Sequence, residues 1–229
     1  MPRQNNFLYN TSTVISIQNI SMNYTFTLPE NYLEDSPKKD LVLPENANGV
    51  VLHCCCAPCS IGQVQCLLVN HIKPLMFFYN PNIYPEDEYI KRRDEWICLC
   101  KQVGLEYIIG DYNHQEYLDS VRGLEDEPER GNRCLMCFKH RLLVTAQIAK
   151  QRNINLFATT LCTSRWKSKK QVDAAGFYAQ EKTRIKYWDQ DWRKEGLVER
   201  RYQLVKEIDF YNQQYCGCEF SINKDSYRK

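Results

Sequence analysis

From Gly49 onward, short apolar runs alternate with longer segments that have the length and polarity of surface helices. This alternation is typical of βαβ units, in which helices join parallel strands and cover the sheet. It predicts strands over residues 49–53, 74–79, 105–109, 155–160 and 184–187. It predicts helices over residues 57–71, 86–103, 134–152, 168–181 and 196–211. We therefore expect an α/β domain with a mostly parallel sheet flanked by helices.

Residues 1–48 differ from the rest of the chain, because they are rich in Asn, Pro and charged residues and show no sustained apolar period. We expect them to form an N-terminal extension to a single α/β domain over residues 49–229. The 30 basic and 28 acidic side chains give a net charge of +2, so contact with nucleic acid would need local basic patches. The sequence shows neither a secretory signal nor a run of about 18 apolar residues. These absences predict a cytoplasmic protein without a membrane partner.

Eight of the twelve cysteines lie in three short clusters. The run His-Cys-Cys-Cys-Ala-Pro-Cys occupies residues 53–59, and two pairs follow, Cys134/Cys137 and Cys216/Cys218. In a reducing compartment, clustered cysteines are more often metal ligands or redox catalysts than structural disulfides. The spacing leaves an iron–sulfur cluster, a zinc site and a metal-free redox site open. Four other cysteines lie in apolar patterns and are expected to be inert core residues: Cys66, Cys98, Cys100 and Cys162.

The predicted topology brings the loops after four strands to one edge of the sheet. In an open parallel sheet, the ligand site lies outside the carboxyl ends of the strands. These loops contain residues 54–59, 80–82, 110–111 and 162–164. Asp111 is a candidate metal ligand or proton donor in the third loop, and capping of the following helix is the alternative role. We expect a cysteine-rich metal site at this rim.

Two basic segments also contain aromatic residues, at positions 165–170 and 188–201. Lys and Arg can neutralise phosphates, and aromatic rings can stack on unpaired bases. Such segments are often only solvated faces of a protein. Their position next to the predicted rim suggests RNA binding as an alternative to that simple interpretation.

Six segments, taken together and in order, resemble one known family. They are HCCCAPCS at 53–60, FYNPNIYPEDEYIKRRDE at 78–95, GDY at 110–112, GLEDEPERGNRCLMCF at 123–138, ATTLCTSRWKSKKQ at 158–171 and YCGCEFS at 215–221. Together they resemble the cobalamin-independent epoxyqueuosine reductases, the QueH family. The likeness covers roughly residues 49–221, and Cys54 is an additional thiol at a variable position of the family motif.

This resemblance implies a Rossmann-like domain of the HUP type that reduces epoxyqueuosine to queuosine at the wobble position of tRNA. The implied reaction is the two-electron removal of the epoxide oxygen, the last step of queuosine biosynthesis, with tRNA that contains epoxyqueuosine as partner. An unidentified donor of low potential would supply the electrons. The resemblance also implies a 4Fe-4S cluster, whose ligands would be Cys55, Cys56, Cys134 and Cys137.

The same resemblance implies roles for the remaining clustered cysteines. Cys216 and Cys218 correspond to a redox-active pair, which would form a disulfide during turnover. Some members of the family carry a second iron ion. For this ion we assign Asp111 as the carboxylate ligand, with two of Cys59, Cys216 and Cys218 as thiolates.

Two other functions are compatible with the pattern of cysteines. One is a different thiol- or zinc-dependent tRNA-modifying enzyme, such as a sulfur transferase that uses ATP. Such an enzyme would carry a Gly/Ser-rich phosphate loop after the first strand, where this chain has Cys and Pro. The other is a zinc-stabilised RNA-binding module without catalytic activity, which would be colourless.

Overall fold

The computed structural model describes residues 24–164, 167–211 and 213–222. In these residues, five strands form one sheet in the order β3-β2-β1-β4-β5, and all neighbouring strands are parallel. The strands are β1 (Val51–Cys54), β2 (Leu75–Phe78), β3 (Tyr107–Ile109), β4 (Leu156–Thr159) and β5 (Lys186–Tyr187). The predicted α/β fold is confirmed, and the sheet is wholly parallel.

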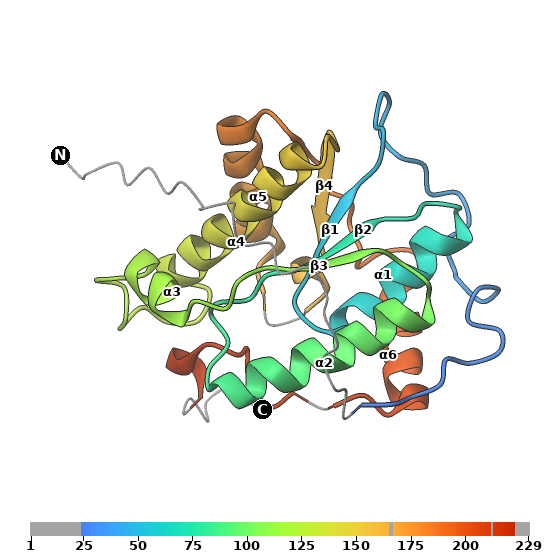
Figure 1. Cartoon of the computed structure of the whole chain (residues 1–229), viewed down its shortest axis with the longest axis horizontal. Coiled ribbons are helices and arrows are strands. Elements are labelled where there is room, and N and C mark those ends of the chain that lie inside the picture. Colours follow the sequence, from blue (N-terminus) through green and yellow to red (C-terminus); the bar gives the residue numbers. More distant parts are fainter. Residues whose placement is uncertain (1–23, 165–166, 212, 223–229) are drawn as a thin grey trace.

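Helices cover both faces of this sheet. They are α1 (Ala57–Val69), α2 (Glu86–Gln102), α3 (His114–Ser120), α4 (Asn132–Gln151), α5 (Lys169–Thr183) and α6 (Leu197–Ile208). Figure 1 shows α4 and α5 on one face and α1, α2 and α6 on the other. Two short 3-10 helices, Leu161–Thr163 and Glu219–Ser221, complete the described elements. All five predicted helices are confirmed to within a few residues at each end.

The interior of the sheet explains why its strands are continuous apolar runs. Every residue of β1, β2, β3 and β4 is buried, because helices pack on both faces. In α4, the residues of the predicted apolar face, among them Phe138, Leu142 and Ala149, are buried in this core. Helix α5 packs closely on β5, since a side chain at Gly176 would overlap the ring of Tyr187.

Residues 24–48 contain no helix or strand but are attached to the α/β core by hydrogen bonds. The Tyr32 hydroxyl donates to the carbonyl of Ile61 in α1 at 2.9 Å. The amide N–H of Asn48 donates to the Asn155 side chain at 3.1 Å, and the Asn155 N–H donates back to Asn48 at 3.0 Å. Residues 1–23 lie outside the described part, and the division of the chain at residue 48 stays a prediction.

None of the helices in the described residues has the length and apolar content needed to cross a bilayer.

Candidate active site

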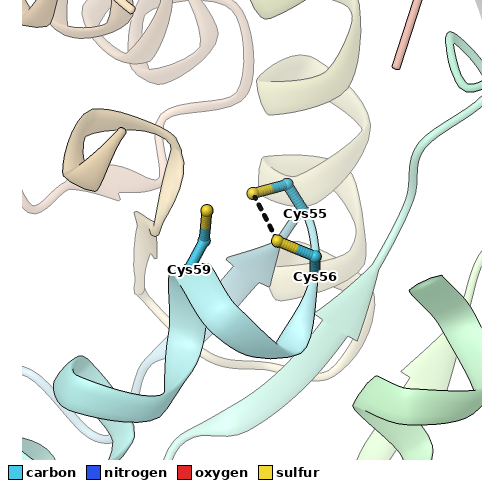
Figure 2. Close-up of side chains that lie close together, drawn as sticks. All are labelled: Cys55, Cys56 and Cys59. Carbon is cyan, nitrogen blue, oxygen red and sulfur yellow. Dashed lines mark hydrogen bonds between the residues drawn. The ribbon is translucent and has the colours of Figure 1, made fainter. Parts of the chain in front are cut away.

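Three thiols converge at the carboxyl end of β1, next to the carboxyl end of β4. The chain leaves β1 toward β2 on one side and β4 toward β5 on the other, so the sheet order reverses at this point. A reversal of this kind creates the crevice in which open α/β sheets bind ligands. Figure 2 shows Cys55, Cys56 and Cys59 turned toward one another there. Their sulfur atoms all lie within 4.8 Å of one another, and 3.8 Å separates Cys55 Sγ from Cys56 Sγ.

The start of α1 holds this thiol trio, by which we mean Cys55, Cys56 and Cys59. Cys56 is the extended N-cap residue, and a proline follows in the first turn, where the missing N–H costs no helical hydrogen bond. The free N–H groups and the dipole of a helix start favour anionic thiolates. Hydrogen bonds from Cys56 and then Cys59 hold the pKa of Cys55 well below its usual range. The hydrogen bond with Cys55 raises the pKa of Cys59 to about 11.

The geometry and chemistry of the trio fit a metal. Two thiolates on one tetrahedral metal with bonds of about 2.3 Å lie about 3.8 Å apart. The sulfur atoms of Cys55 and Cys56 already have this separation, 3.8 Å. Soft thiolate ligands select zinc, copper(I) or the iron of an iron–sulfur cluster. The prediction of a cysteine-rich site that can bind a metal at the rim of the sheet is therefore confirmed.

A second group of four thiols lies between the start of α4 and the C-terminal segment. Burial raises the pKa of Cys134 to about 11, and the negative charges of Cys216 and Cys218 contribute to this rise. Burial also raises the pKa of Cys137 to about 12. A small cavity is lined by Cys134, Cys216 and Cys218, and the Tyr117 hydroxyl shares a hydrogen bond with the Cys218 thiol.

The two groups of thiols remain separate in the structure. Within the described residues, only the trio brings three potential metal ligands within 4.8 Å of one another. The structure thus places Cys59 with Cys55 and Cys56, and places Cys134 and Cys137 near Cys216 and Cys218. The four-cysteine ligand set implied by the family stays a prediction, as does the redox role of Cys216 and Cys218, which are free thiols here.

A cavity of about 470 Å³ connects the trio with the C-terminal segment, since Cys55, Cys59 and Cys216 all line it. Its volume lies within the range of about 300–1,000 Å³ that is usual for small-molecule sites. Most of its other lining residues are basic, aromatic or amide side chains: Arg92, Arg141, Lys167, Arg201, Tyr202, Tyr211, Tyr215, Asn80, Asn82, Gln213 and Gln214. Such a lining suits a polar ligand with planar rings and anionic groups.

Lys167 places a buried ammonium group in this cavity. Burial alone would lower its pKa, but attraction by Cys216, Cys55 and Cys59 outweighs burial and leaves the pKa raised. Arg193 holds the backbone of this loop, because it donates to the carbonyl of Lys167 at 2.8 Å. Lys167 therefore stays charged and offsets the negative charge of the thiolates.

Arg92 lies in the first half of α2 and holds the backbone of residues 215–218, which we call the C-terminal cysteine loop. Its Nη1 donates to the carbonyl of Cys216 at 3.1 Å, and its Nη2 donates to that of Tyr215 at 3.2 Å. The buried carboxylate of Glu88 accepts a third hydrogen bond from Nε at 2.7 Å. Gly217 meets the same guanidinium with a φ of 113°, and an added Cβ would lie 2.8 Å from Nη1. This position therefore needs glycine for its conformation and for space.

Asp111 follows β3 at the predicted rim, but it does not cap the next helix. The side chain of Asn113 accepts the amide N–H of Glu116 at 3.1 Å and is the N-cap of α3. The alternative capping role for Asp111 is therefore wrong. Asp111 lies near Glu116, whose pKa is raised first by burial and then by the Asp111 charge. Its proposed role as a metal ligand stays a prediction.

The aromatic residues of the second basic segment are buried and cannot stack on bases. Trp188 and Trp192 are 8% and 1% exposed and pack edge to face against each other. In the first segment, residues 165–166 lie outside the described part, and Lys169 is paired with Asp173 at 2.6 Å. The expectation that these indole rings form an RNA-binding surface is wrong, because their side chains belong to the core.

The four cysteines predicted to be inert are all buried, as expected: Cys66, Cys98, Cys100 and Cys162. Cys54 joins them in the core, since it is the last residue of β1 and its thiol donates to the Leu52 carbonyl at 3.4 Å. Burial raises the pKa of Cys54 to about 12.

Comparison with known proteins identifies the family to which this chain belongs. Residues 50–224 match the family described as "Epoxyqueuosine reductase QueH". The chain is 41% identical over 186 residues to a protein of that name from Haemophilus influenzae, a match that covers 81% of this chain and 76% of that one. It is 40% identical over 187 residues to the Acinetobacter baylyi protein of that name, covering 81% and 86%. For the Thermotoga maritima protein, the identity is 34% over 177 residues, covering 76% and 90%. The chain therefore belongs to the epoxyqueuosine reductase QueH family.

Proposed function

We propose that this protein is the oxidoreductase that converts epoxyqueuosine to queuosine in tRNA, the last step of queuosine biosynthesis, without cobalamin. The observation that carries the proposal is that one polar cavity, large enough for a modified nucleoside, is lined by Cys55, Cys59 and Cys216. The family to which the chain belongs supplies the reaction. Two electrons and two protons remove the epoxide oxygen as water and leave a carbon–carbon double bond.

The abundance of thiols supports a 4Fe-4S cluster as the cofactor, because such clusters are held by cysteine thiolates. Its proposed ligands are Cys55, Cys56, Cys134 and Cys137. When bound, the cluster would pass single electrons toward the substrate. A second iron ion is proposed at Asp111, with two thiolates from among Cys59, Cys216 and Cys218.

The basic side chains of the cavity have a defined part in this proposal. Lys167 and Arg141 line the cavity, and in the proposed complex their positive charge would stabilise the negative charge that develops on the epoxide oxygen as its bond to carbon breaks. Arg141 is held in place because it donates to the Tyr79 carbonyl at 3.3 Å and to the side chain of Asn80. Preorganised charges of this kind favour bond breaking without rearranging during the reaction.

The test of the proposed function is nucleoside analysis of tRNA. Anaerobically purified protein, given a low-potential reductant and tRNA that contains epoxyqueuosine, is expected to form queuosine in the absence of cobalamin. A strain without this protein should accumulate epoxyqueuosine and regain queuosine on complementation. Unchanged queuosine, in a strain with no other such reductase, would reject the proposal.

The spectrum of the anaerobic protein separates the proposal from a zinc-stabilised RNA-binding module. An iron–sulfur protein is brown, whereas a zinc protein is colourless. A colourless protein that contains one zinc ion per chain and binds tRNA without reaction would favour the module.

Asp111→Asn tests the second iron directly. The substitution keeps the size of the side chain but removes the carboxylate charge that a hard metal–oxygen bond requires. We expect loss of one iron per chain with retention of the cluster sulfide, and a fall in turnover of about 10- to 100-fold. Metal analysis after anaerobic reconstitution gives the result. Unaltered iron content and activity would leave Asp111 without a metal role.

A further inference from the structure

Only three aromatic side chains are highly exposed in the part of the chain that the structure describes: Tyr84, Phe177 and Tyr202. Their exposed fractions are 43%, 46% and 47%. Tyr202 lines the cavity that contains the thiols, and Tyr84 directly follows Ile83, which also lines it.

Tyr84 is the outer ring of a column of four aromatic side chains. It stacks on His114, with ring centres 5.1 Å apart and planes inclined by 25°. His114 stacks on Tyr112, and Tyr112 stacks on Tyr89 with a centre distance of 4.1 Å. His114 is itself fixed by a contact of 2.8 Å with the carbonyl of Pro81. The column therefore packs against one side of the Tyr84 ring and fixes the ring in a position where it is exposed to solvent.

The backbone of Tyr84 is attached to the C-terminal cysteine loop at the cavity. Its N–H donates to the Gly217 carbonyl at 2.8 Å, and its own carbonyl accepts a hydrogen bond from the Tyr215 hydroxyl. Ile83 and Tyr215 both line the cavity. The backbone of Tyr84 is thus at the edge of the cavity, hydrogen-bonded to the residue that follows Cys216.

Tyr202 lines the same cavity from α6. The Arg201 guanidinium lies 4.3 Å from the centre of its ring, and Arg201 in turn donates to the Pro58 carbonyl at the start of α1 at 3.3 Å. A cation against a tyrosine ring stabilises the orientation of that ring. Tyr202 is therefore an oriented aromatic surface that adjoins the thiol trio.

We propose that Tyr84 and Tyr202 are stacking surfaces for the unpaired bases that flank the modified nucleotide of the tRNA. This inference rests on the proposed function and identifies the protein surface that would recognise the RNA. A nucleotide that enters the cavity leaves its stack, so its neighbours in the single-stranded loop lose a stacking partner. An exposed aromatic ring replaces that partner, and every base offers a face for it. Because both rings are already fixed, little conformational freedom is lost on binding.

The test compares affinities for an anticodon stem-loop RNA that carries guanosine at the wobble position and so does not react. With the anaerobically purified holoenzyme, Tyr84→Ala and Tyr202→Ala are each expected to weaken binding by about 5- to 100-fold, the usual value of one base–aromatic stack. Tyr84→Phe and Tyr202→Phe keep the ring and should bind as the wild type does. Phe177→Ala removes the third exposed ring, which lies on α5 and has no neighbour in sequence that lines the cavity, and serves as the matched control.

The same stem-loop with abasic sites at the two flanking positions shows whether the rings contact bases. On that RNA, the wild type and the Ala variants should bind equally weakly, because the stacking partner is gone. In turnover, the Ala variants should raise KM for tRNA by a larger factor than they lower kcat.

Two results would overturn the inference, and they differ from each other. If the wild type binds and reduces its tRNA while both Ala variants bind within about twofold of it, the stacking surfaces are rejected and the proposed function stands. If the wild type binds no stem-loop RNA and forms no queuosine, the proposed function fails and the stacking surfaces fail with it.

Discussion

Replacement of Cys55 by serine is expected to remove the bound metal and to abolish reductase activity. Cys55 is the member of the trio whose pKa is held below its usual range, by hydrogen bonds from Cys56 and Cys59. A serine hydroxyl stays protonated at neutral pH and gives a poor ligand to a soft metal. The same result is expected for the other proposed ligands, Cys56, Cys134 and Cys137. Iron and sulfide per chain after anaerobic reconstitution, together with visible absorbance, provide the measurement.

Cys98→Ser is the matched control for these variants. Cys98 is also buried, but it lies on α2 and is not part of the trio. The side chain of Gln102 donates a hydrogen bond to its sulfur at 3.5 Å, and a serine hydroxyl oxygen can accept the same hydrogen bond. Full iron and sulfide in all four ligand variants would contradict the proposed ligand set. Cys59→Ser separates two assignments: loss of sulfide would make Cys59 a cluster ligand, whereas loss of iron alone would assign it to the second ion.

Arg92→Ala is expected to reduce turnover by about two orders of magnitude, the usual effect of misplacing a reacting group by about 1 Å. The variant loses the two hydrogen bonds that hold the carbonyls of Tyr215 and Cys216. It also leaves the Glu88 carboxylate, which is 6% exposed, without its cation. Breaking a buried pair in this way costs about 3–5 kcal/mol, so we expect Tm to fall by at least about 6 °C.

A measurement on the thiols distinguishes positioning of the loop from loss of stability alone. In Arg92→Ala, at a temperature where the protein is still folded, alkylation of Cys216 and Cys218 should be faster than in the wild type. Arg92→Lys should restore stability in part but not the alkylation rate, since one ammonium group cannot reproduce the planar fork. Arg152→Ala, which removes an exposed ion pair with Glu106, is the control. Equal alkylation rates in Arg92→Ala and the wild type would show that Arg92 does not position the loop.

Much of the fold could be predicted because its signals are local. Strands β1, β2 and β4 are buried on both faces, so they appear in the sequence as continuous apolar runs. The face of α4 that packs on the sheet repeats its apolar residues every three or four positions. Helix α3 was not predicted, because it has seven residues and buries only Tyr117, which leaves no period to detect.

The candidate site was predictable only where residue type itself carries the information. The cysteines of residues 55–59 stand out because clustered thiols have few roles in a reducing compartment. Arg92 gave no such signal beyond a possible pair with Glu88 one helical turn away, and its hydrogen bonds to residues 215 and 216 depend on tertiary structure.

The exposure of aromatic residues could not be predicted from the sequence either. Sequence composition drew attention to Trp188 and Trp192, which are buried, and passed over Tyr84 and Tyr202, which are exposed. Whether a ring faces solvent or core is decided by the packing of distant segments. Composition alone therefore predicts that aromatic residues are present near the rim but not which of them a ligand can reach.

The distance along the chain between the trio and Cys216 fixes an order of events during synthesis. Cys55, Cys56 and Cys59 leave the ribosome with the first strand and helix of the domain, whereas Cys216 and Cys218 follow only after α6 has been made. In the complete chain, Arg92 holds the carbonyl of Cys216, and Cys216 lines the same cavity as Cys55 and Cys59. The cavity is therefore complete only after the last residues of the domain have been made. A chain truncated after α6 would lack Cys218 and the residues of the last segment that line the cavity, Cys216 among them.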